Sequence, residues 1–117
     1  MRAADRDQAP TREAAAQFRA LLERFPSSEM APDARVRLAE AEGRLAKQII
    51  EIADFYYSQH DYHAAARRYR LALTSYPSHP DRARTMVMLG VSLSRLRLHG
   101  EAEGTLRRAL ELGPDEE

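Results

Sequence analysis

The longest apolar pattern in the chain runs from position 34 to position 56 without a break. Its members lie 4, 3, 4, 4, 3 and 4 positions apart: Ala34, Leu38, Ala41, Leu45, Ile49, Ile52 and Tyr56. This is the spacing of one face of an α-helix. Gly43 lies inside the pattern, and it costs about 1 kcal/mol relative to alanine, too little to force a break. The pattern therefore predicts a single helix over 31–59, about twice the length of a repeat helix.

Shorter patterns of the same period predict four further helices, so the fold class is all-α. The five antiparallel helices are expected over 12–25, 31–59, 62–76, 80–97 and 100–112. Prolines end several of them, because the residue before a proline is pushed out of the helical region. The polar residues 1–10 are expected to form a flexible N-terminal segment, and 114–117 a flexible tail. One helical domain is then expected over 11–113.

The stretch from Asp54 to Pro77 has the bulky, small and terminating residues of a tetratricopeptide repeat. Equivalent residues recur 37 positions later: Leu106 is at the position equivalent to Tyr69, and Ala109 is at the position equivalent to Ala72. A standard repeat has about 34 residues, so the extra residues are expected in the loop around Pro80. The residues expected to form the repeat core are Ile49, Ile52, Ala53, Tyr56, Tyr62, Ala65, Tyr69, Ala72, Pro77, Leu89, Gly90, Ala102, Leu106, Ala109 and Pro114.

Stacked repeats of this kind form an α-solenoid with an extended concave groove, where a partner protein is expected to bind. By repeat position, the groove residues are predicted to be Lys47, Ile50, Asp54, Tyr57, Arg84, Val87, Val91, Ser94 and Arg95. Their mixed charges suit an extended or loop segment of a partner. No polar helix follows Leu112, so the apolar face near Leu106 and Leu110 is expected to be uncovered. Self-association through such solenoid ends is plausible.

Charge and composition exclude several functions. Eighteen basic residues balance eighteen acidic ones, which argues against binding to nucleic acid or an anionic membrane. The chain has no cysteine, so it has no disulfide, thiolate metal site or cysteine nucleophile. It contains neither an apolar run long enough to span a bilayer nor the apolar middle region of a secretory signal. The protein is then either cytosolic or a mature piece of an exported chain.

No residue cluster predicts catalysis, a cofactor or a metal. His60, Asp61 and His63 are close in sequence, but we interpret them as turn and helix-cap residues. His79 and His99 are assigned to the other turns. Glu40, Glu42 and Glu51 are spaced for ion pairs on the surface of a helix. Arg67, Arg68 and Arg70 are expected on a solvated convex face. We therefore predict a non-enzymatic protein.

Several short motifs together resemble one family. They are Arg24-Phe25-Pro26, Asp33-Ala34-Arg35, Arg44-Leu45-Ala46, Tyr56-Tyr57 and Tyr62-His63-Ala64-Ala65, preceded by Asp5-Arg6-Asp7-Gln8. In this order they resemble the C-terminal half of the BamD (ComL-type) lipoproteins of the outer-membrane β-barrel assembly machinery. The resemblance covers about residues 5–112. The chain departs from the family pattern at His60, where glycine is usual.

The resemblance implies a tetratricopeptide scaffold at the periplasmic face of the outer membrane. Its implied partner is the periplasmic region of the barrel-forming subunit or another envelope protein, with no nucleic acid. Membrane contact is expected only through a lipid anchor outside these residues. Without the resemblance, the alternative is a cytosolic tetratricopeptide adaptor that binds a peptide segment of a partner protein.

Overall fold

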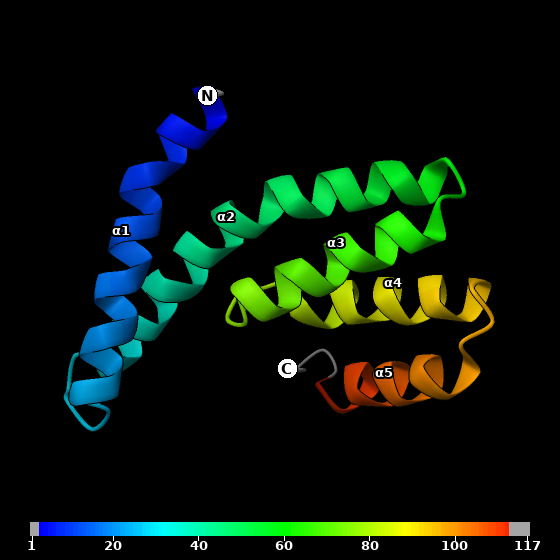
Figure 1. Ribbon diagram of the computed structural model, residues 1–117. Helices are drawn as coiled ribbons and strands as arrows, with labels where there is room; N and C mark the ends of the chain where they lie inside the picture. Colours follow the sequence, from blue (N-terminus) through cyan, green and yellow to red (C-terminus); the bar gives the residue numbers. More distant parts are fainter. Residues whose placement is uncertain (1–2, 113–117) are drawn as a thin grey trace.

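The computed structural model describes residues 3–112, which form five α-helices in succession. These are α1 (Ala3–Arg24), α2 (Ala31–Ser58), α3 (Tyr62–Ser75), α4 (Arg82–Arg95) and α5 (His99–Leu112). Each helix packs against the next one along the chain (Figure 1). The predicted all-α, tetratricopeptide-like solenoid of five antiparallel helices is confirmed.

Helix α2 is the spine shared by two helical hairpins. It has 28 residues and continues across Gly43, as the apolar spacing predicted. Its first half lies beside α1 and its second half beside α3 (Figure 1). The first half forms a small core of Ala15, Leu38, Ala41 and Leu45 with α1. The second half forms the larger core, together with α3, α4 and α5.

The start of α1 corrects a prediction. The helix expected over 12–25 begins at Ala3, inside the segment expected to be flexible, and Pro10 lies within it. A proline in a helix removes one backbone hydrogen bond and crowds the preceding turn. Alanine-rich sequence on both sides of Pro10 favours the helix, so this local cost does not set the boundary. The expected tail, 114–117, lies outside the described residues.

The turns that close the last two hairpins share one backbone conformation. His60 has a φ of 63° and Arg97 a φ of 67°, in the left-handed region that favours glycine. The two residues are separated by 37 positions (97 minus 60), the same offset as the core residues. This conformation explains why the repeat pattern usually has glycine at the position of His60.

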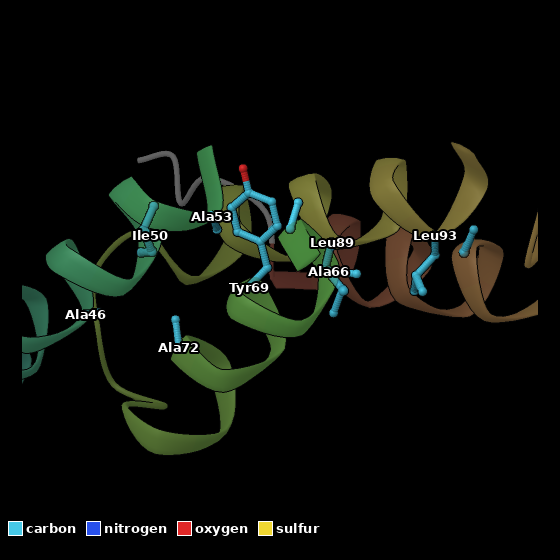
Figure 2. Packing of buried hydrophobic residues seen from close by; sticks show 10 residues of the cluster. Ala46, Ile50, Ala53, Ala66, Tyr69, Ala72, Leu89 and Leu93 are labelled. Carbon is cyan, nitrogen blue, oxygen red and sulfur yellow. The ribbon is translucent and has the colours of Figure 1, made fainter. Parts of the chain in front are cut away.

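Small residues and one large aromatic form the main core. Figure 2 shows the Tyr69 side chain extending from α3 between α2 and α4, with Ala53 and Leu89 nearby. Alanines at 46, 53, 65, 66 and 72 are all buried. Because alanine has so short a side chain, the helices approach closely around the tyrosine ring. Tyr69 is fully buried, and its hydroxyl donates a hydrogen bond to Asp54.

The predicted core residues fall into two groups. Those that are buried are Ala53, Ala65, Tyr69, Ala72, Leu89, Gly90, Ala102 and Ala109; those that are half-buried are Ile49, Ile52, Tyr56, Tyr62 and Leu106. Pro77 is exposed, and Pro114 lies outside the described residues. Leu106 packs against Gly90, whereas Leu110 is 80% exposed. The apolar end of the solenoid is therefore uncovered at Leu110 within the described part of the chain.

Candidate protein-docking surfaces

Four of the nine predicted groove residues line one pocket. Lys47, Ile50 and Asp54 of α2 face Arg84 of α4 across a space of about 300 Å³, which we call the α2–α4 pocket. The α3–α4 loop (residues 76–81) closes one side through His79, Pro80 and Asp81, and the remaining lining residues are Gly43 and Glu51. These four side chains, which were predicted from their repeat positions, therefore lie around one pocket in the structure.

The α2–α4 pocket has a central ion pair and several free charges. One Asp54 oxygen accepts a hydrogen bond from the Tyr69 hydroxyl, and the other lies 3.6 Å from the Arg84 guanidinium. Burial raises the pKa of Tyr69 above its ordinary value, and the bond to Asp54 raises it further. Lys47 and Glu51 have no ion-pair or hydrogen-bond partner within residues 3–112. The pocket can therefore pair with either sign of charge.

The other predicted groove residues do not line this pocket. The Arg95 guanidinium lies over the Tyr62 ring, 5.6 Å from its centre, and Tyr57 meets the same ring edge-on at 5.3 Å. Val87 is exposed on α4, while Val91 and Ser94 are half-buried. Ile50, which lines the α2–α4 pocket, is only 8% exposed and also belongs to the main core, so it offers little surface to a partner. The predicted groove therefore splits into a charged pocket and an aromatic cluster.

A larger pocket lies between α2 and α3. It has a volume of about 500 Å³ and is lined by Tyr56, Ala64, Arg67, Arg68 and Leu71; we call it the α2–α3 pocket. Neither Arg67 nor Arg68 has an ion-pair or hydrogen-bond partner among the described residues. Sequence reasoning missed this pocket, because it treated the arginines as a solvated surface and Tyr56 as core.

One signal in the sequence could have indicated the α2–α3 pocket. Phe55 lies beside the apolar stripe of α2 rather than on it, and it is 59% exposed. Its ring meets Tyr56 edge-on at 5.8 Å. Leu71 is also exposed, on the same helix as the arginines. Large apolar residues outside a helical stripe, close to arginine, have the composition of a binding surface.

A third, smaller pocket lies where α1 turns into α2. It measures about 170 Å³, and its lining is mostly apolar: Leu21, Leu22, Phe25, Ser28, Met30, Ala31 and Ala34. Phe25 is half exposed, with the Arg24 guanidinium over its ring at 5.2 Å. The carbonyl of Pro26 accepts a hydrogen bond from Arg35 at 3.1 Å. These contacts stabilise the turn between the two helices.

Two polar residues expected at the surface or in a turn are buried. Glu42, predicted to form surface ion pairs, is 0% exposed; it pairs with Arg19 of α1 and accepts the Ser78 backbone N–H at 2.6 Å. His79 does lie in a turn, but it is buried. One ring nitrogen lies 2.7 Å from the Tyr76 carbonyl oxygen and the other 3.1 Å from the Thr85 hydroxyl. Helical spacing could not reveal either, since the partners come from other elements.

The histidines and acids form no metal-binding group within residues 3–112. Asp61 accepts a hydrogen bond from the Ala64 N–H at 3.1 Å, and the His60 ring contacts Tyr62 at 5.9 Å. These two residues cap α3 and close its turn. In the same part of the chain, no helix is both long and apolar enough to cross a membrane.

Comparison with known proteins identifies the family. The outer membrane protein assembly factor BamD of Vibrio cholerae serotype O1 is 38% identical over 73 residues, which cover 62% of this chain and 30% of the relative. The Neisseria gonorrhoeae factor of the same name is 32% identical over 107 residues, which cover 92% of this chain and 40% of the relative. The chain thus spans well under half the length of these relatives.

The family match extends over most of the chain. Residues 1–107 fit the profile of the YfiO family, which is described as an outer membrane lipoprotein. Helices α1 to α4, the first part of α5 and the motifs from Arg24 to Ala65 lie within that range. On this basis, the chain belongs to the YfiO family of outer membrane lipoproteins.

Proposed function

We propose that this chain is the interaction scaffold of an outer-membrane assembly lipoprotein, and that it docks another protein subunit without catalysing a reaction. The relatives are outer membrane protein assembly factors, which supports this proposal. The scaffold would act at the periplasmic face of the outer membrane, with the periplasmic region of the barrel-forming subunit as its partner. Family membership favours this over a cytosolic adaptor.

The α2–α3 pocket is the observation that carries the proposal. It is the largest of the pockets described above, and it combines two arginines without partners with Tyr56, Leu71 and the neighbouring Phe55. Tyrosine and arginine dominate the residues that contribute most to binding at protein interfaces. A guanidinium also forms paired hydrogen bonds with a carboxylate. The surface therefore suits a partner that presents an acidic side chain beside an apolar one.

The predicted groove, which comprises the α2–α4 pocket and the aromatic cluster around Tyr62, is proposed as a second contact. Lys47 is available for a partner, but Arg84 already lies close to Asp54 and Arg95 stacks on Tyr62. A partner would have to replace these internal contacts before it gained from the two arginines. For this reason, the α2–α3 pocket is expected to contribute more to affinity.

The two surfaces can be separated by paired charge reversals. The wild-type lipoprotein and its variants would be titrated with the purified periplasmic region of the barrel-forming subunit, by isothermal calorimetry. Arg67→Glu with Arg68→Glu is expected to weaken binding by at least about tenfold. Arg84→Glu with Arg95→Glu tests the predicted groove, and Arg107→Glu, on the exposed side of α5, is the matched control.

Each outcome has a distinct meaning. Loss of binding in the Arg67 and Arg68 variant alone supports the α2–α3 pocket. Loss in the Arg84 and Arg95 variant alone would transfer docking to the predicted groove, which comprises the α2–α4 pocket and the aromatic cluster around Tyr62. If both variants bind as tightly as wild type, or if wild type does not bind, docking of this subunit through these pockets is wrong.

A further inference from the structure

The α3–α4 loop is held against the middle of α2. The Ser78 N–H donates a hydrogen bond to one Glu42 oxygen at 2.6 Å. At the next position of α2, a side chain on Gly43 would come within 3.0 Å of the Pro80 ring. Between these two contacts, His79 is buried. The loop therefore lies so close to α2 that a side chain at position 43 would press against the Pro80 ring.

The same glutamate also holds α1. The second oxygen of Glu42 pairs with the Arg19 guanidinium, whose side chain remains 41% exposed. A fully buried carboxylate is stable only while its charge is paired and its oxygens accept hydrogen bonds. The two groups that donate to the Glu42 oxygens come from helix α1 and from the α3–α4 loop, which are far apart in the sequence. One carboxylate thus joins three parts of the fold.

We propose that Glu42 couples the position of α1 to the conformation of the α3–α4 loop. If α1 shifts and Arg19 withdraws, the carboxylate is left with one donor in a dry environment. It must then turn towards water, which removes the acceptor of the Ser78 N–H and releases the loop. A contact that displaces α1 would therefore release the α3–α4 loop, although α1 does not line the α2–α4 pocket.

Release of the α3–α4 loop would alter the α2–α4 pocket, part of one of the two proposed docking surfaces. His79, Pro80 and Asp81 form one wall of the α2–α4 pocket, opposite Lys47 and Asp54. A released loop changes the width of that pocket. This coupling rests on the contacts of Glu42 alone, so it holds whether or not the pocket binds a partner.

Amide hydrogen exchange, measured by NMR on the full chain, tests the coupling. Arg19→Met keeps the length of the side chain and removes its charge. Exchange is then expected to rise by at least about tenfold at Ser78 and at Arg82, whose N–H donates to the His79 carbonyl within the loop. The matched control is Arg24→Met, which removes another arginine of α1 that lies over the Phe25 ring and does not contact Glu42. It should leave exchange in the loop unchanged.

A second variant separates charge from hydrogen bonding. In Arg19→Met with Glu42→Gln, the amide oxygen can still accept the Ser78 N–H and no buried charge is left, so slow exchange at Ser78 should return. Glu42→Gln alone serves the same purpose if Arg19→Met does not fold. The proposal is overturned if Ser78 exchanges at the wild-type rate in Arg19→Met, or if Arg24→Met releases the loop equally. It also fails if Glu42→Gln, with or without Arg19→Met, exchanges rapidly at Ser78.

Discussion

Gly90 of α4 and Leu106 of α5 are packed so closely that no side chain fits between them. A Cβ atom at position 90 would lie 2.6 Å from both Cγ and Cδ2 of Leu106. Gly90 is in the middle of a helix and has ordinary helical geometry, so its role is to provide space rather than conformational freedom. This contact sets how closely the last two helices approach.

Gly90→Ala is therefore expected to destabilise the protein. Alanine favours the helix over glycine by about 1 kcal/mol, but overpacking typically costs about 1–3 kcal/mol. We expect a net loss of about 1 kcal/mol, measured by urea unfolding followed by circular dichroism. Gly104→Ala is the matched control, because its nearest neighbour is the flexible end of Arg108 at 3.8 Å. It should stabilise the protein, and a gain in both variants would contradict the packing argument.

Tyr69→Phe tests the buried hydroxyl and its dependence on pH. Loss of the bond to Asp54 is expected to cost about 1 kcal/mol at neutral pH. Because the pKa of Tyr69 is raised in the folded state, the unfolded chain loses this proton first as the pH rises. With an unfolded pKa of about 10, the free energy of unfolding of wild type is expected to fall by about 0.8 kcal/mol at about pH 10.5. The variant has no hydroxyl at this position, so its free energy of unfolding does not change in this way.

The measurement is urea unfolding of both proteins at the two pH values. The stability difference between wild type and Tyr69→Phe should be present below the unfolded pKa and shrink above it. A difference that stays constant or grows between neutral and alkaline pH would show that Tyr69 ionises as easily in the folded protein. Tyr76→Phe serves as the control, because Tyr76 is half-buried and its hydroxyl makes no hydrogen bond within residues 3–112.

Two aspartates at helix starts offer a matched pair. Asp61 accepts a hydrogen bond from the Ala64 N–H at the start of α3, whereas Asp81 precedes α4 without a side-chain cap. Asp61→Ala is expected to lower the free energy of unfolding by about 1 kcal/mol. Asp81→Ala should lower it by less than about 0.5 kcal/mol, through the helix dipole alone. Equal losses in thermal unfolding would show that the capping bond does not account for the difference.

Leu110 tests self-association through the uncovered end of the solenoid. It is 80% exposed on α5, and an exposed apolar residue there can pair with another copy of the chain. Sedimentation velocity over a concentration series is expected to show association of wild type and a monomer for Leu110→Asp. Val36→Asp places the same change on an exposed apolar residue of α2 and should associate like wild type. A wild type that stays monomeric throughout would contradict this prediction.

The sequence alone was enough to determine the helices and their order. The periodicity from Ala34 to Tyr56 predicted one long helix, and the structure has it over Ala31–Ser58. The offset of 37 positions predicted equivalent residues, and it recurs in the backbone at His60 and Arg97. These features depend on residues close together in the chain, whose spacing determines which face of a helix is apolar.

The tertiary structure alone decided what each helix face meets. Helical spacing placed Glu42 at a surface, but Arg19 and Ser78 approach it from other elements and bury it. Ile50 was assigned to a groove; it lines the α2–α4 pocket and is also part of the main core, a burial that its repeat position did not reveal. The start of α1 also differed, because one proline removes a single hydrogen bond and neighbouring residues decide whether the helix continues. Burial and charge pairing depend on segments that are far apart in the sequence. Local periodicity does not show which of these segments come into contact.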